Sequence, residues 1–261
     1  MKNLLSKAKR QAFVTAFLLC SCSQLMWAQS AVEDSTRQYA YEIPSVDERR
    51  AEFRRSLIAP AAFFVAGGIA FTDNPIWSDD AWEDARNRNF PDFRTTADDY
   101  LAFAPIVAAY GLELAGVKGA HSLRDRSAIL FKAELIAVAI VTPLKLGTNR
   151  VRPNGDNDES FPSGHTAQAF ISATFLHREY GHLSPWYSIG GYAVAGSVGV
   201  LRILNNKHYL SDVLFGAGIG LLATNLAYLT HGYKRTKRIE GLTIMPTYNE
   251  GTVGVFAGLR F

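Results

Sequence analysis

The sequence predicts an all-α fold, a helical bundle of about six core helices followed by a small C-terminal β-hairpin. The first observation is that 48% of the 261 residues are apolar and gather in long runs rich in Ala and Leu. Strands are shorter, roughly 4 to 8 residues, so runs of this length favour helices. The second observation is the tail, where Leu242–Tyr248 and Thr252–Phe261 flank Asn249–Gly251. Alternating apolar residues around this turn are typical of a hairpin.

The first 28 residues have the pattern of a signal peptide. Lys2–Arg10 is positively charged, Ala12–Leu19 is apolar, and the small residue Ala28 ends a candidate cleavage site. This pattern predicts export to the periplasm or the cell envelope. Two alternatives stay open: an uncleaved membrane anchor, because Met26 is large for its position, and a lipoprotein signal in which Cys22 is acylated.

Three further segments follow: a linker with a leading helix (29–56), a helical domain (57–233) and a tail with the hairpin (234–261). The helical domain contains the apolar runs expected to form helices, namely Leu57–Phe71, Tyr100–Leu112, Ala128–Leu144, Thr166–Leu176, Trp186–Leu201 and Val213–Thr230. Thr72–Asp99 is polar and rich in Asp and aromatic residues. It is expected to be a long loop with short helical pieces, and is a candidate lid.

Charge and cysteine content exclude two classes of protein. The formal net charge is +3, but the first 28 residues hold four of the 27 basic residues and no acid. Without them, 23 basic residues stand against 24 acidic ones, a net charge of −1, so no nucleic-acid partner is expected. Both cysteines, Cys20 and Cys22, lie in the same segment, so its cleavage would exclude a disulfide framework.

The apolar runs leave open whether the chain spans a membrane. A span needs roughly 20 apolar residues, and only Val213–Thr230 approaches this length. Ala128–Leu144 carries Lys132 and Glu134, whose charges are costly in a bilayer. Six alternating spans would place the basic segments on one side of the membrane, as the positive-inside rule requires. This arrangement needs the first span to start in the cytoplasm, whereas a cleaved signal peptide would place the same point outside. The sequence indicates an exported, membrane-associated helical domain and does not define its oligomeric state.

Three short blocks concentrate the chemistry, and the last of them holds His208 and Asp212. The two are four residues apart and share one face if the segment is helical. A carboxylate bonded to one imidazole nitrogen fixes the tautomer and leaves the lone pair of the other nitrogen exposed, which makes a histidine nucleophilic. Arg202, six residues before His208, is a bidentate donor for oxyanions. Taken alone, a His/Asp pair at this spacing is more often structural.

The middle block is Pro162-Ser163-Gly164-His165, a tight turn before an expected helix. Ser163, Gly164 and His165 then lie at a helix N-terminus, where free backbone N–H groups bind anions. His165 in that place is suited to act as a general acid. The alternative is that Ser163 is simply an N-cap, although a cap does not require His165.

The first block is Lys145 and Arg152, seven residues apart, with Gly147 between them and Pro153 after them. The glycine lets the backbone bend, so both cations can converge on one anion and neutralise charge on its oxygens. The alternative is a solvated basic turn, in which Lys145, Arg150 and Arg152 serve as charges at a helix C-terminus.

In this order and spacing, the three blocks resemble the motifs of the type 2 phosphatidic acid phosphatase family. This family includes bacterial lipid A and undecaprenyl pyrophosphate phosphatases, bacterial nonspecific acid phosphatases and vanadium haloperoxidases. Every motif position matches except one, because Leu201 stands where the family usually has Ser. The motifs span Lys145–Asp212, and the flanking helices extend the likeness from about Leu57 to Tyr233.

The resemblance implies an all-helical bundle with a phosphatase site that needs neither a metal nor a cofactor. It implies that His208 attacks phosphorus to form a phosphohistidine and that Asp212 orients His208. It also implies that His165 protonates the leaving group and then activates water. The residues implied to hold the phosphate oxygens are Lys145, Arg152, Ser163, Gly164 and Arg202.

Three functions compete under this resemblance. A membrane-associated lipid phosphatase would act on lipid A, a prenyl pyrophosphate or phosphatidic acid, and the export signal and apolar helices favour it. A periplasmic nonspecific acid phosphatase would take small phosphomonoesters, and the short helices favour that. A vanadium-dependent haloperoxidase is disfavoured because such enzymes are generally larger. Thr72–Asp99 is expected to influence the choice of substrate.

Overall fold

A computed structural model describes residues 45–232, 243–249 and 252–258 of the chain. The predicted signal peptide and most of the linker lie outside the described residues. The chain divides into two units, Met1–His231 and Gly232–Phe261, and each is described by itself.

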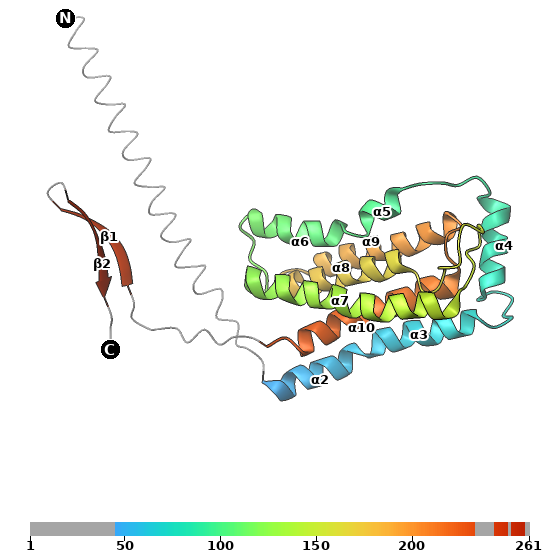
Figure 1. Ribbon diagram of the computed structural model, residues 1–261, viewed down its shortest axis with the longest axis horizontal. Coiled ribbons are helices and arrows are strands. Elements are labelled where there is room, and N and C mark those ends of the chain that lie inside the picture. The colour runs from blue at the N-terminus through green and yellow to red at the C-terminus, as the bar shows by residue number, and fades with distance from the viewer. Residues whose placement is uncertain (1–44, 233–242, 250–251, 259–261) are drawn as a thin grey trace, which may run out of the picture. The chain divides into compact units, whose positions relative to one another are not determined.

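The regular elements described in the first unit are all helices (Figure 1), which confirms the predicted fold class. They are α2 (Val46–Ser56), α3 (Ile58–Ala70), α4 (Asp79–Asn89), α5 (Ala97–Leu101), α6 (Ala104–Leu114), α7 (Leu123–Thr148), α8 (Gly164–Tyr180), α9 (Pro185–Leu204) and α10 (Leu210–Leu229). Each predicted apolar run corresponds to a helix, except that Tyr100–Leu112 is divided between the end of α5 and α6. Thr72–Asp99, expected to be mostly loop, contains all of α4 and the start of α5.

Helices α8 and α10 form the centre of the bundle. Helix α10 packs against α3, α7 and α8, and α8 also packs against α6 and α9. Ala169 and Phe175 on α8 and Ala217 and Ala223 on α10 are each at most 1% exposed. Helices buried on nearly all sides are held firmly by their surroundings. Groups at the N-terminal ends of α8 and α10 are therefore anchored in the core.

Helix α10 approaches α8 closely at two glycines, Gly216 and Gly220. A Cβ atom added at Gly220 would lie 2.4 Å from the carbonyl oxygen of Ala167, and one at Gly216 would lie 2.5 Å from that of Ser163. Both distances are far shorter than van der Waals contact, so only glycine permits this separation of the two backbones. The first turn of α8 is thereby fixed beside α10.

Four helical segments are long and apolar enough to cross a membrane: Arg50–Ala70, Leu123–Thr148, Pro185–Leu204 and Leu210–Leu229. The helices are longer than their apolar runs because they continue into the polar residues at either end. Large apolar side chains on α3, α7 and α9 are more than half exposed, among them Ile58, Val65, Phe131, Leu135, Val138, Trp186 and Ile189. Soluble monomers rarely expose apolar surface on this scale, so these faces are suited to contact lipid.

The second unit contains the predicted hairpin. Strands β1 (Thr243–Asn249) and β2 (Thr252–Gly258) pair antiparallel, with Asn249 opposite Thr252 at one end of the ladder and Thr243 opposite Gly258 at the other. The alternation in the sequence tail therefore predicted the pairing correctly. The ends of the two predicted strands at Leu242 and beyond Gly258 lie outside the described residues.

Substitution of Gly220 by alanine tests the close contact between α8 and α10. Gly220→Ala is expected to lower the free energy of unfolding by about 1 to 3 kcal/mol, because the new methyl group overpacks the interface. The matched control is Gly190→Ala in α9, where an added Cβ meets no described atom outside its own helix within 4 Å. This control is expected to leave stability unchanged or to raise it by about 0.5–1 kcal/mol. Thermal unfolding in detergent measures both, and equal midpoints would contradict the close contact.

Candidate active site

The three sequence blocks meet at one end of the bundle. Lys145 lies in the last turn of α7, Ser163 caps α8 and Arg202 lies in the last turn of α9. His208 lies in the connection from α9 to α10, and Asp212 lies in the first turn of α10. Helix α4 crosses the same end of the bundle, beside the loop between α7 and α8 (Figure 1). Four helix ends therefore converge on one place.

His208 and Asp212 form a buried pair at the centre of the site. Nδ1 of His208 lies 3.5 Å from Oδ2 of Asp212, and the side chains are 1% and 0% exposed. This contact is longer than an ordinary hydrogen bond, and Nδ1 has no hydrogen-bond partner in the described part of the chain. His208 precedes the helix, so the two residues do not share a helix face as their spacing predicted. The turn at Tyr209 brings them together instead.

The environment of His208 keeps its imidazole neutral. Burial is the main cause, and despite the opposing charge of Asp212 the pKa of His208 is lowered to about 4. The positive charges of Arg202 and Lys145 act in the same direction as burial. A neutral imidazole that presents Nδ1 to a carboxylate has Nε2 available as a nucleophile.

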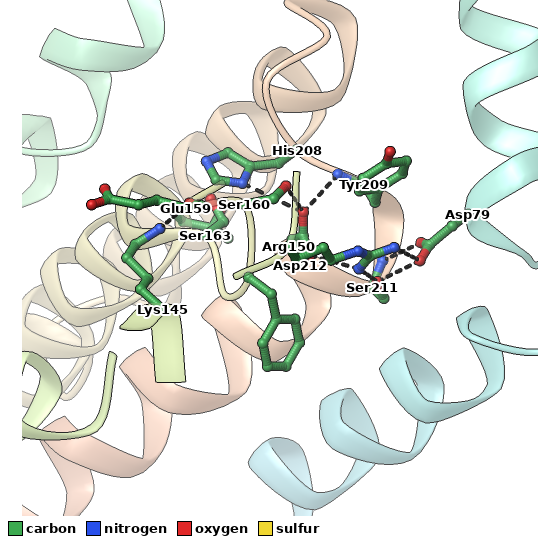
Figure 2. Close-up of polar contacts among 12 residues, drawn as sticks. Asp79, Lys145, Arg150, Glu159, Ser160, Ser163, His208, Tyr209, Ser211 and Asp212 are labelled. Carbon is green, nitrogen blue, oxygen red and sulfur yellow. Dashed lines mark hydrogen bonds and ion pairs between the residues drawn. The ribbon is translucent and has the colours of Figure 1, made fainter. Parts of the chain in front are cut away.

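Several donors hold the carboxylate of Asp212. Its Oδ2 accepts hydrogen bonds from the hydroxyl of Ser160 at 2.5 Å and from the backbone N–H of Tyr209 at 2.9 Å. Its Oδ1 accepts a hydrogen bond from Arg150 at 2.8 Å. The carboxylate is therefore fixed in position beside His208, as Figure 2 shows.

Arg150 links Asp212 to helix α4. Its guanidinium donates to Asp212 and to the hydroxyl of Ser211 at 2.7 Å, and on its other side to Asp79 at 2.6 Å (Figure 2). The guanidinium also lies 4.1 Å from the ring centroid of Tyr209. Asp79 in turn accepts hydrogen bonds from the backbone N–H and the hydroxyl of Ser211. The planar guanidinium of Arg150 therefore positions the carboxylate of Asp212 and is not available to bind a further anion.

Three cations surround the remaining space near His208. Nζ of Lys145 donates to the carbonyl oxygen of Glu159 at 2.5 Å. Arg152 and Arg202 each have a buried Nε without a hydrogen-bond partner among the described residues. Burial, followed by the charge of Arg202, lowers the pKa of Arg152. Unmet donors and mutually repelling cations favour the binding of an anion at this point.

The N-terminus of α8 completes the site. The hydroxyl of Ser163 accepts hydrogen bonds from the N–H and the hydroxyl of Thr166, so this serine is an N-cap, as the alternative interpretation held. Beside Gly164 an added Cβ would meet no described atom outside the helix within 4 Å, so space is open next to the free N–H groups. Nε2 of His165, on the same turn, lies 2.8 Å from Oδ1 of Asp99.

The structure places every predicted site residue at this end of the bundle, namely Lys145, Arg152, Ser163, Gly164, His165, Arg202, His208 and Asp212. Sequence reasoning missed Arg150 as the partner of Asp212, and it missed the acids Asp79, Asp98 and Asp99. The available signal was the high Asp content of Thr72–Asp99. Among the described residues, no cluster of three or more His, Cys, Asp or Glu side chains is arranged to hold a metal ion.

The fold and the site together define an α-helical protein of the phosphate-handling class, with a buried histidine set among cations. Residues 127–236 match the family model of the PAP2 superfamily. The matched segment contains all three blocks, so the family resemblance predicted from the motifs is confirmed.

One relative is the lipid A 1-phosphatase of Porphyromonas gingivalis, which is 36% identical over 228 residues. The alignment covers 81% of this chain but 48% of the relative, so the chain spans about half the length of that protein. One similar solved structure is LpxE of Aquifex aeolicus, with a TM-score of 0.42 and 22% identity. The match covers 55% of this chain and 92% of LpxE. Another is the transmembrane PAP2 type phosphatidylglycerolphosphate phosphatase of Bacillus subtilis, with a TM-score of 0.41 and 20% identity. This match covers 66% of this chain and 94% of the Bacillus protein.

Removal of Arg150 tests the link between α4 and the carboxylate of Asp212. Arg150→Ala is expected to lower the free energy of unfolding by about 2 kcal/mol or more, the cost of losing hydrogen bonds to buried charged groups. Arg88→Ala in α4 is the control, because Arg88 pairs with Asp84 at 3.9 Å on the surface with both side chains at least 70% exposed. Such a pair contributes roughly 0–1 kcal/mol. Equal effects of the two substitutions in thermal unfolding would contradict this role of Arg150.

Proposed function

We propose that the protein is a metal-independent phosphatase that hydrolyses a phosphomonoester or pyrophosphate of a membrane lipid through a phosphohistidine intermediate on His208. The observation that carries the proposal is the buried, neutral His208, which has Asp212 on one side and the charges of Lys145 and Arg202 nearby, with Arg152 next to them. A nucleophile needs a free lone pair, and the charge that develops on phosphate oxygens needs fixed cations. Both requirements are met within one small region.

In the proposed reaction, Nε2 of His208 forms a bond to phosphorus as the bond from phosphorus to the leaving oxygen breaks. Asp212 orients the ring and stabilises the positive charge that it acquires. Lys145, Arg152, Arg202, the hydroxyl of Ser163 and the backbone N–H of Gly164 hold the phosphate oxygens. His165 gives a proton to the leaving oxygen and later takes one from the water that attacks the phosphohistidine.

Membrane association supports a lipid substrate. Four helical segments have the length and hydropathy of membrane spans, and α3, α7 and α9 expose large apolar side chains. The similarity to a lipid A 1-phosphatase favours a phosphorylated lipid over a small ester. We include lipid A, prenyl pyrophosphates and phosphatidic acid as candidate substrates.

The distribution of charge supports a site that faces the periplasm. Basic residues gather at the opposite end of the bundle, where Arg178 contacts Glu52 of α2 and Arg126 contacts Tyr180. Lys118 also lies there, just before α7. By the positive-inside rule, these charges favour the cytoplasm for this end and the outer side for the site. This orientation requires α2 to start in the cytoplasm.

Replacement of either histidine tests the proposed function directly. Purified protein in EDTA is expected to release phosphate from lipid A or undecaprenyl pyrophosphate faster than from para-nitrophenyl phosphate. His208→Ala and His165→Ala are each expected to lower hydrolysis by at least about 100-fold. His182→Ala, at an exposed histidine away from the site, is the control.

Three results would correct the proposal. Retained hydrolysis by folded His208→Ala would exclude the phosphohistidine mechanism. Loss of activity in EDTA would exclude metal independence, and comparable rates on the small ester would indicate a nonspecific acid phosphatase.

The pH dependence of kcat/KM tests the roles of the two histidines. His208 must be neutral to attack, and its pKa is lowered to about 4, so activity is expected to fall below about pH 4. His165 must be protonated to act as an acid, and burial followed by the charge of Arg202 lowers its pKa below the ordinary 6.5. Activity is therefore expected to peak between these values and to fall as pH rises through neutrality. A rate that still increases above neutral pH would contradict the role of His165.

A further inference from the structure

Two adjacent acids of α5, Asp98 and Asp99, contact the cationic side of the site. Oδ2 of Asp98 accepts a hydrogen bond from Arg202 at 2.7 Å, and Oδ1 accepts one from the side-chain amide of Asn205 at 3.0 Å. Oδ1 of Asp99 lies 2.8 Å from Nε2 of His165 and 3.8 Å from Arg202. Neither acid belongs to the three sequence blocks. One short helix therefore supplies a carboxylate to the expected phosphate-binding arginine and another to the expected general acid.

The surrounding contacts hold α5 in a fixed position. The side chain of Asn205 accepts from the N–H of Thr95 and donates to the carbonyl oxygen of the same residue, both at 2.9 Å. Asp98 and Ala102 are 1% and 0% exposed. The hydroxyl of Ser172 on α8 donates to the carbonyl oxygen of Ala102 at 2.6 Å. Helix α5 is thus bound to α8 and to the end of α9, so its carboxylates have a defined orientation.

The contact to Asp99 distinguishes the two nitrogens of His165. A carboxylate only accepts hydrogen bonds, so Nε2 of His165 must carry the proton when it contacts Asp99. Nδ1 is then the nitrogen that can exchange a proton with a substrate. The side chains of His165 and Asp99 are 40% and 45% exposed, so a leaving group from outside the bundle has access to the ring.

On the basis of the proposed function, we infer that Asp99 is the positioning residue of proton transfer, which holds His165 by Nε2 so that Nδ1 faces the leaving oxygen. As the bond from phosphorus to that oxygen breaks, Nδ1–H donates its proton to the oxygen. The neutral Nδ1 then takes a proton from water while the water oxygen bonds to phosphorus and His208 departs. The proton count on His165 is restored at the end of the cycle.

The charges around His165 explain why it needs such a partner. Burial and the positive charge of Arg202 on α9 lower the pKa of His165, whereas Asp99 and Asp98 on α5 raise it. Without Asp99, the positive charge of the protonated imidazole would lie beside Arg202, and Asp98 would be the negative charge left to balance it. Asp98, however, already binds Arg202. Asp99 therefore supports the protonated form as well as the orientation of the ring.

Leaving groups of different quality test this inference. Phenyl phosphate has a poor leaving group that requires protonation, whereas 2,4-dinitrophenyl phosphate has a good one that does not. Asp99→Asn is expected to lower kcat/KM about 100-fold for phenyl phosphate, the lower range for general acid catalysis, and less than about threefold for the dinitrophenyl ester. The alkaline limb of its pH profile should also move to lower pH.

Two further variants separate positioning from structural support. Asp98→Asn disturbs Arg202 and is expected to lower kcat/KM for both esters by a similar factor, because phosphate binding is common to both. Asp84→Asn, at an acid of α4 with a side chain 72% exposed, is expected to change neither. Nitrogen-15 NMR of His165 adds a readout that is independent of turnover: the wild-type protein should show a protonated Nε2, and Asp99→Asn a mixture of tautomers.

The outcomes distinguish this inference from the proposed function. An equal loss on both esters in Asp99→Asn, or an unchanged tautomer in this variant, would overturn the role of Asp99 while leaving the phosphatase intact. A folded wild-type protein that hydrolyses no phosphate ester at all would overturn the proposed function and this inference with it. A selective loss on phenyl phosphate together with the shifted pH profile would establish the inference.

Discussion

The buried carboxylate of Asp212 is the group on which the rest of the structure depends. Its oxygens accept hydrogen bonds from Arg150, Ser160 and the backbone of Tyr209, and its carbonyl oxygen accepts the N–H of Ser163 at 3.0 Å. One residue therefore connects the loop after α7, the start of α8 and the turn before α10. A carboxylate removed from water is costly without such donors. The requirements of the fold and those of the site are met by the same contacts.

Charge at the site is compensated selectively. Three acids before α6 pair with groups at the site: Asp79 with Arg150, Asp98 with Arg202, and Asp99 with His165 and, at 3.8 Å, with Arg202. No ion pair within the described residues engages Lys145 or Arg152. The positioning groups are thus neutralised by fixed carboxylates, while two cations keep positive charge for a ligand. This division explains how a bundle with little net charge can concentrate positive charge at one point.

The helices and the three blocks could be predicted because their signals are local: run length, composition and fixed spacing. The partners of the site could not, because they come from distant parts of the chain. Asp79 binds Ser211 across 132 positions, and Asp98 binds Arg202 across 104. Both acids belong to a stretch with the composition of a loop, and its aspartates gave no indication of which cation each contacts. His208 lies outside α10 for the related reason that helix boundaries depend on caps and turns.

The close contact of α8 and α10 at Gly216 and Gly220 has a mechanical consequence. The N-terminal end of α8 and the carboxylate of α10 belong to one tightly packed pair, because the two backbones leave no space for a side chain at these glycines. Bilayers differ in thickness, and membrane helices respond by tilting. A tilt of this pair carries both chemical groups together and leaves the distance between them unchanged. In a bilayer, the distance between these two groups would therefore not depend on the lipid composition.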